Sequence, residues 1–246
     1  MPESGFKRIG SSPLFFAVVC GCFIACVIFI GIALHLWGAV EVRTDGGENL
    51  FVTFFGLIWL VISRFLFFWF GLSVRDDVVA GGNPAALFAF CGGWIAMAFI
   101  YVGGSVGEGP SYSENVFSCG LGAAAFFALW LVLELGARVS VSITEERDLA
   151  SGLRLAAFQL SIGLILARAL AGNWHSAANT LHDFWQDGWL ALPLLGIALF
   201  GEWFLRPSGV RPFPSGLLAG LLPALMYLAL AIGWVWRRGP WEGMPK

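Results

Sequence analysis

The sequence contains seven long apolar stretches, separated by short segments rich in glycine, serine, asparagine, proline and charged residues. A helix needs about 20 apolar residues to cross the hydrocarbon core of a bilayer. The windows that meet this requirement are 13–40, 50–73, 84–106, 116–138, 149–172, 188–206 and 212–236. We therefore predict an all-α, polytopic membrane helix bundle of about seven transmembrane helices, formed by a single integral membrane domain over 1–246.

Composition narrows the class of protein further. Hydrophobic residues make up 58% of the chain and charged residues 12%, and the mean hydropathy is +0.80. A soluble domain normally carries about 25% charged residues, which it needs to cover a surface exposed to water. The formal net charge of −2 offers no basic surface to nucleic acid. We expect the lipid bilayer around the chain, and no nucleic-acid partner.

The positively charged residues predict the orientation, because lysine and arginine gather in cytoplasmic loops. With a cytoplasmic N-terminus, the inner segments hold Lys7, Arg8, Arg75, Arg138, Arg147, Arg206 and Arg211. The outer segments hold Arg43 and, against the rule, the tail residues Arg237, Arg238 and Lys246. We expect the cytoplasmic N-terminus and an uncleaved first span over 13–40, since that stretch is too long for a signal peptide. The alternatives are a re-entrant last segment and a lipoprotein cleavage at Cys20 or Cys26.

Recurring short motifs indicate an internal repeat. The segments 134–138 and 202–206 both begin with Glu and end with Arg, a spacing that allows an ion pair on one helix face. Ser-Gly-Leu recurs at 151–153 and 215–217, near the start of two windows. These matches predict three repeated helical hairpins after the first span. Asn83 and Asp148 stand where N-caps belong, directly before a window.

The same two helix starts carry a resemblance to a known family. The stretch 76–90, DDVVAGGNPAALFAF, resembles the acidic turn and Asn-x-Ala-Ala helix start of the bacterial membrane family called domain of unknown function 350. The stretch 145–163 resembles that family's second helix start, with Asp148 in place of its Asn and Ser151 in place of an Ala. The resemblance implies a four-helix unit over 50–172, a shortened second unit in the terminal hairpin 188–236, and a place in the bacterial inner membrane. It implies no activity.

Charged side chains at membrane depth are the first candidates for function, because they are costly there. Arg64 lies near the middle of the window 50–73, where insertion costs about 2.5–3.5 kcal/mol. It needs an acidic partner, carbonyl groups or water, and Glu134 and Glu202 are the available acids. The alternatives are a structural ion pair that fixes the bundle, a role in a pathway or a ligand site, and a helix boundary that differs from the predicted one. Glu134, Arg168 and Glu202 lie near predicted helix ends, where local pairing also explains them.

One window carries polar residues along a single side. Arg154, Ser161 and Arg168 recur every seven residues, which places them on nearly one face of a helix, with Gln159 close by. We expect this face to line the bundle interior, because lipid would not solvate it. The candidate intramembrane polar site is thus Arg64, Glu134, Arg154, Ser161, Arg168 and Glu202.

The remaining motifs exclude several classes of chemistry. Lys7 and Lys246 are the only lysines and both are terminal, so a retinal Schiff base is excluded; His35 lacks a second histidine at membrane depth for haem. The cysteines at 20, 22 and 26 lack the spacing of a zinc site. We predict no catalytic residue, cofactor or metal ligand.

Three functional hypotheses follow. The first is a channel-, transporter- or sensor-like protein for a small ion or molecule, alone or as a homo-oligomer. The second is a non-catalytic accessory subunit of a larger membrane complex. The third is a membrane enzyme acting on lipid through the loop of His175 and His182.

Overall fold

The computed structural model describes residues 13–206, 217–241 and 244, and the regular elements of this part of the chain are helices. The long ones are α1 (Pro13–Trp37), α3 (Gly46–Trp69), α4 (Pro84–Ser105), α5 (Tyr112–Ala137), α7 (Leu149–Leu170) and α10 (Leu222–Arg238). The shorter ones are α2 (Val40–Thr44), α6 (Val139–Thr144), α8 (Ala177–Gly188), α9 (Ala191–Leu205) and the π-helices η1 (Val74–Ala80) and η2 (Leu217–Leu221).

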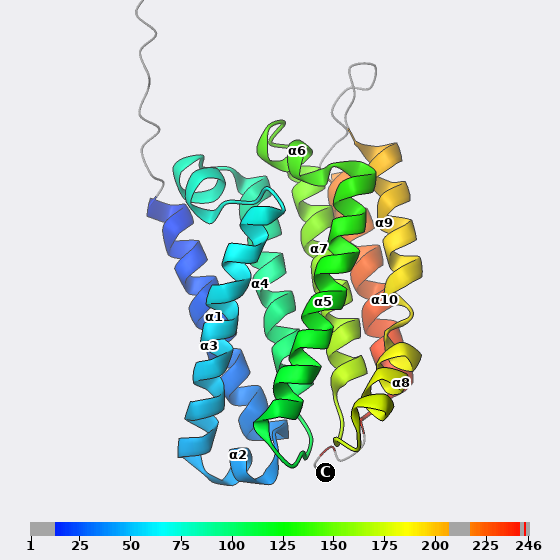
Figure 1. Ribbon diagram of the computed structural model, residues 1–246. Coiled ribbons are helices and arrows are strands. Elements are labelled where there is room, and N and C mark those ends of the chain that lie inside the picture. Colours follow the sequence, from blue (N-terminus) through cyan, green and yellow to red (C-terminus); the bar gives the residue numbers. More distant parts are fainter. Residues whose placement is uncertain (1–12, 207–216, 242–243, 245–246) are drawn as a thin grey trace, which may run out of the picture.

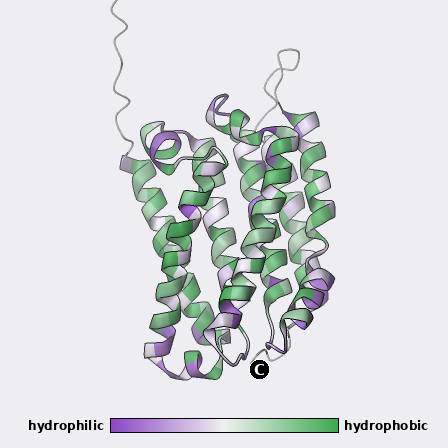
Figure 2. Ribbon diagram, in the orientation of Figure 1, coloured by the Kyte–Doolittle hydropathy of each residue, from purple (hydrophilic) through white to green (hydrophobic). Residues whose placement is uncertain are grey.

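The long helices stand side by side as one bundle (Figure 1). Six helices in the described ranges are long and apolar enough to cross a membrane, and α8 with α9, bent by 43°, makes seven when this pair is counted as one broken span. Figure 2 shows hydrophobic ribbon through the middle of the bundle and most hydrophilic ribbon at its two ends. The prediction of an all-α polytopic membrane bundle is confirmed.

The bent span corrects the predicted window 188–206 and the predicted loop before it. Residues 177–188 are helical, and Ser176 caps this helix by accepting a hydrogen bond from the amide of Asn179. The polar residues of this segment, from which a loop was predicted, lie on one side of α8. This helix is amphipathic and lies at the end of the bundle. Proline at 193 lies in the first turn of α9, where a missing amide costs little.

The limits of α3 are also shifted from the predicted window 50–73. The helix begins at Gly46, because Asp45 accepts a hydrogen bond from the amide of Gly47 and caps it. It ends at Trp69, just before Gly71, whose φ of +75° is a conformation that glycine adopts readily. The shift moves Arg64 from the middle of the span to its last turns.

The core of the bundle is the parallel pair α4 and α7 (Figure 1), which are 72% and 78% buried over their most apolar windows. Small residues meet along the whole contact: Ala85 faces Gly152, Gly92 faces Ala156, Ala96 faces Gly163 and Gly103 faces Ala167. A Cβ on any of these glycines would lie within 3 Å of the opposite backbone. The two backbones are therefore in contact, which small residues permit in a membrane.

The N-caps predicted for this pair are confirmed. Asn83 accepts hydrogen bonds from the amides of Ala85 and Ala86, and Asp148 accepts from those of Ala150 and Ser151. Each cap follows a short helix, η1 or α6, and Asn83 also donates to the carbonyl of Ile143 at the end of α6. The two helix starts are thus built alike and joined. The third repeat start, at 215–217, falls largely outside the described residues, so the threefold repeat stays a prediction.

Candidate functional site

Arg154 on α7 and Glu202 on α9 form a buried ion pair near one end of the bundle. The Arg154 Nε donates to Glu202 Oε1 at 2.6 Å, and Nη2 donates to Oε2 at 2.8 Å. Arg154 is 1% exposed and Glu202 is 3% exposed. A charge-assisted pair of this two-point geometry is among the strongest that side chains form.

The guanidinium of Arg154 forms two further hydrogen bonds. Nη2 donates to the Ser151 hydroxyl at 2.8 Å, and Nη1 donates to the carbonyl of Ala219 in η2. The Asp148 carboxylate, which caps α7, lies 3.9 Å from Nη2. The cluster therefore holds one guanidinium and two carboxylates, from α7, its N-cap and α9, together with a backbone carbonyl of η2.

The local sequence explains why these groups meet. Arg154 is the sixth residue of α7, so it lies about 8 Å along the helix from its start. Ser151 lies one turn earlier on the same face, between Arg154 and the cap Asp148. Glu202 lies one turn before the end of α9, and the two helices run in opposite directions. The charges are therefore brought to the same depth.

Arg168 forms a second ion-paired cluster at the other end of α7. Its Nη1 lies 3.1 Å from Asp187 Oδ2 on α8, and its Nε donates to the carbonyl of Gly239 at 3.0 Å. Arg238 at the end of α10 also pairs with Asp187. The carbonyl of Asp187 accepts from the indole of Trp234 at 2.8 Å. This cluster fixes α8 and the end of α10 to α7.

Ser161 lies halfway between the two clusters. It is seven residues from Arg154 and from Arg168, so it lies on the same side of α7, about 10 Å from each along the helix. Its side chain is fully buried, and its hydroxyl has no hydrogen-bond partner within the described part of the chain. Gln159 is likewise buried and unpartnered there, but it lies on another side, next to Gly93 of α4.

The structure therefore brings together four of the six predicted site residues, Arg154, Ser161, Arg168 and Glu202, along one side of α7. Sequence reasoning missed Asp187 and Arg238, because both were assigned to loop or tail. The signal for Asp187 is its helical spacing from Asp183, which places both on one side of an amphipathic helix.

Arg64 does not join this site. It is exposed on the outer side of α3, and its guanidinium carbon lies 5.0 Å from the ring centre of Phe65. The acids expected to pair with it are bonded elsewhere, since Glu202 pairs with Arg154 and Glu134 accepts hydrogen bonds from the amide and hydroxyl of Ser140. The expectation of a central arginine is wrong, because the helix ends five residues later.

The ion pairs that the Glu-x-x-x-Arg motifs allow are not formed either. Arg138 has a φ of 50°, so the helix ends there and its side chain leaves the face of Glu134. Arg206 pairs instead with Glu146 at 3.2 Å and donates to the carbonyl of Ala137 at 2.9 Å. These bonds tie the end of α9 to α5 and to the segment before α7.

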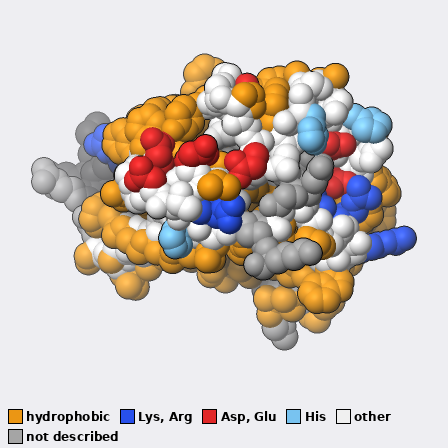
Figure 3. Space-filling model, turned by 90° about the horizontal axis from the view of Figure 1, so that it is seen from below, with side chains coloured by type: hydrophobic (Ala, Val, Ile, Leu, Met, Phe, Trp, Pro, Cys, Tyr) orange, Lys and Arg blue, Asp and Glu red, His pale blue; other side chains and the backbone are white. Residues whose placement is uncertain are grey.

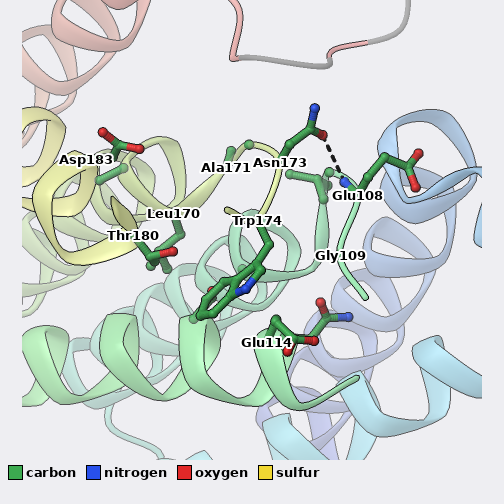
Figure 4. Close-up of a pocket in the computed structure, with 16 residues that line it drawn as sticks. Glu108, Gly109, Glu114, Leu170, Ala171, Asn173, Trp174, Thr180 and Asp183 are labelled. Carbon is green, nitrogen blue, oxygen red and sulfur yellow. Dashed lines mark hydrogen bonds between the residues drawn. The ribbon is translucent and has the colours of Figure 1, made fainter. Parts of the chain in front are cut away.

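Acidic side chains gather on the end of the bundle that holds Arg168, as the view from below shows (Figure 3). A small cavity of about 50 Å³ opens there between α5, α7 and α8, lined by Glu114, Trp174, Thr180 and Asp183 (Figure 4). The amide of Glu108 donates to Asn173 Oδ1 at 3.0 Å beside it. The volume is large enough for a water molecule and too small for an organic substrate.

The described residues contain no group of three or more His, Cys, Asp or Glu side chains that could hold a metal ion. Cys22 and Cys26 on α1 and Cys91 on α4 line an apolar cavity of about 560 Å³ on the side of the bundle. His182 contacts Gln186 on α8 through its Nε2, at 2.7 Å. These contacts assign no metal or cofactor.

Comparisons of the chain with models of protein families, with curated proteins and with solved structures find no match. The resemblance of 50–172 to the family called domain of unknown function 350 therefore stays a prediction.

Proposed function

We propose that this membrane protein is of the channel, transporter or sensor type and that a small ion or molecule moves along α7, on the side facing α8, α9 and α10. The supporting observation is the arrangement of Arg154, Ser161 and Arg168. The two arginines lie in ion-paired clusters near the two ends of the helix, and a buried, unpartnered hydroxyl lies between them. Buried polar groups at membrane depth are costly, and they commonly mark pathways.

The two clusters would act as gates. Each joins α7 to a different part of the α8–α9–α10 segment: Glu202 and the carbonyl of Ala219 at one end, and Asp187 at the other. Breaking one cluster while the other remains closed would open Ser161 to one side of the membrane at a time, which is what alternating access requires. The cluster around Arg154 has two carboxylates and one guanidinium, so its formal charge is negative. The cluster around Asp187 has two guanidinium groups and one carboxylate, so its formal charge is positive.

The test is flux through the purified full chain in liposomes, followed with probes for protons, potassium and chloride. We expect flux of at least one of these, and a reduction of tenfold or more in Ser161→Ala, because the variant removes the polar group halfway along the pathway. Ser142→Ala is the matched control, since Ser142 on α6 is also fully buried and unpartnered but lies away from this side of α7. Absence of all three fluxes, or equal flux in the two variants, would contradict the proposal.

A second candidate function is that of a non-catalytic accessory subunit in a larger membrane complex. The observation that favours it is the outer side of α3, where Phe54, Phe65, Phe68 and Trp69 are exposed, the last by 85%. Aromatic side chains serve both lipid contact and protein interfaces. Purification in mild detergent followed by mass spectrometry would separate the two functions, because a subunit should retain a stoichiometric partner.

We also propose that the start of α1 faces the cytoplasm of a bacterium, in the inner membrane. The arginines at 64, 75, 138, 147 and 206 support this orientation, since they lie at the same end of the bundle as the start of α1. The end of α10 lies at the opposite end. A phosphatase fused after α10 should therefore be active outside the cytoplasm, and the same fusion within the segment 145–148 should be inactive.

A further inference from the structure

A second polar feature lies on the other side of the bundle, in a groove between α1, α3, η1 and α4. The groove has a volume of about 650 Å³. Its walls are apolar and include Phe16, Val19, Phe23, Val61, Val79 and Trp94. Phe16 is 59% exposed and Val61 is 37% exposed, so the groove opens sideways, toward the surroundings of the bundle.

Two arginines, Arg64 on α3 and Arg75 on η1, are the charged residues of this lining. Both are exposed, and neither forms an ion pair with any residue in the described ranges. The carboxylates next to Arg75 are bonded to another residue: Asp76 accepts from the hydroxyl of Ser73 at 2.9 Å, and Asp77 accepts from its amide at 2.7 Å. The guanidinium groups of Arg64 and Arg75 are thus not held by a carboxylate of the described residues, and both can bind a phosphate at this groove.

The two arginines lie near one end of the bundle, where the phosphate of a surrounding lipid would lie. Arg64 lies five residues before the end of α3, about 8 Å along the helix axis, and η1 begins five residues after that end. A guanidinium matches phosphate oxygens with two parallel hydrogen bonds. The apolar walls continue from there toward the middle of the bundle, along α1 and α4. The acyl chain of a lipid whose phosphate lies at the arginines would follow the same direction.

We propose that this groove binds one anionic phospholipid, with its phosphate between Arg64 and Arg75 and an acyl chain against α1 and α4. The orientation proposed above would place the groove in the cytoplasmic leaflet, where basic residues attract anionic lipids. The site is separate from the side of α7 on which transport is proposed, so the two proposals can fail independently. Arg64 is then a lipid-binding residue rather than part of a pathway.

The test is a lipid titration of the purified full chain in mild nonionic detergent, followed by native mass spectrometry. Phosphatidylglycerol and phosphatidylcholine with the same acyl chains are the two probes. We expect the chain to bind the first at least tenfold more tightly, because each basic residue near an anionic headgroup contributes about fivefold. In Arg64→Gln/Arg75→Gln this preference should disappear. Arg237→Gln, an exposed arginine at the other end of the bundle, is the matched control and should keep it.

Two further variants keep the proposal testable if the double variant does not fold. Arg75→Gln alone changes an exposed residue of a short helix, and it should lower the preference for the anionic lipid about fivefold. Ile24→Trp narrows the groove and leaves both arginines in place, so it should lower the binding of both lipids. Equal binding of the two lipids by the unaltered chain, or an unchanged preference in Arg75→Gln, would overturn the proposal. Recovery of a bound protein instead of a lipid, with that protein lost in Ile24→Trp, would also overturn the proposal.

Discussion

Arg154 and Glu202 meet through two hydrogen bonds although 48 residues separate them in the sequence. Both side chains are almost fully buried, so neither charge is solvated by water. A buried ion pair adds little net stability, but loss of one partner leaves an uncompensated charge. This relationship makes the pair the point at which α9 and η2 are fixed to α7.

Glu202→Gln should therefore destabilise the protein by up to about 3–5 kcal/mol, because it leaves the buried Arg154 guanidinium with only the more distant Asp148 carboxylate, at 3.9 Å, as a counter-charge. The double variant Arg154→Met/Glu202→Leu should recover most of that loss. The measurement is thermal unfolding in detergent, with the yield of monodisperse protein as a second readout. Glu146→Gln is the control, since it breaks an ion pair that is partly exposed and should cost about 0–1 kcal/mol. A double variant no more stable than Glu202→Gln would contradict this account.

Gly103→Ala should separate the backbones of α4 and α7. A Cβ at this position would lie 2.3 Å from the carbonyl oxygen of Ala167, which cannot move without shifting the helix. We expect a loss of about 1–3 kcal/mol, as in other overpacked cores. The matched control is Gly120→Ala on α5, where a Cβ meets no atom within 4 Å and alanine favours the helix. Similar unfolding temperatures for the two variants would show that the backbones of α4 and α7 are not in direct contact at Gly103.

Asn83 has two roles that substitutions can separate. Asn83→Ala removes the cap of α4 and the hydrogen bond to the carbonyl of Ile143, and should cost about 2 kcal/mol or more. Asn83→Asp keeps an oxygen that can cap the helix and loses the donor to Ile143. We expect its unfolding temperature to lie between those of Asn83→Ala and the unaltered chain. If both variants unfold at the same temperature, the cap contributes nothing beyond the link to α6.

Asp77 on η1 should make stability depend on pH. Burial raises the pKa of this carboxyl above its ordinary value, against the opposing effect of the hydrogen bond from the Ser73 amide. Because the folded protein then holds the proton more tightly than the unfolded chain does, stability falls as pH rises from about 4 through the raised pKa. Asp77→Asn should remove this part of the dependence and be more stable at neutral pH. Unfolding curves of both proteins between pH 4 and 8 test this, and parallel pH profiles would refute it.

The spans and the helix caps could be predicted because they depend on local sequence. Apolar length marks the spans, and a side-chain oxygen directly before a helix, as at Asn83 and Asp148, marks the start of α4 and α7. The helical face of Arg154, Ser161 and Arg168 also follows from spacing along one element. These features need no knowledge of which helices are neighbours.

The partners of the charged residues could not be predicted, because they come from distant segments. Glu202 and Asp187 contact α7 because α8 and α9 are bent against each other, and the angle of this bend cannot be predicted from the sequence. Arg64 was misplaced for a different reason. The polar cap Asp45 starts α3 four residues earlier than expected. This shift alone places Arg64 near the end of the helix instead of at its hydrophobic centre.

The alternation of glycine and alanine between α4 and α7 also limits how the molecule can change shape. Two backbones in direct contact at four successive levels cannot slide past each other without collisions at every level. The pair must therefore move as a unit, and any rearrangement falls to the outer helices. Transport and lipid binding would then take place on opposite flanks of one fixed axis.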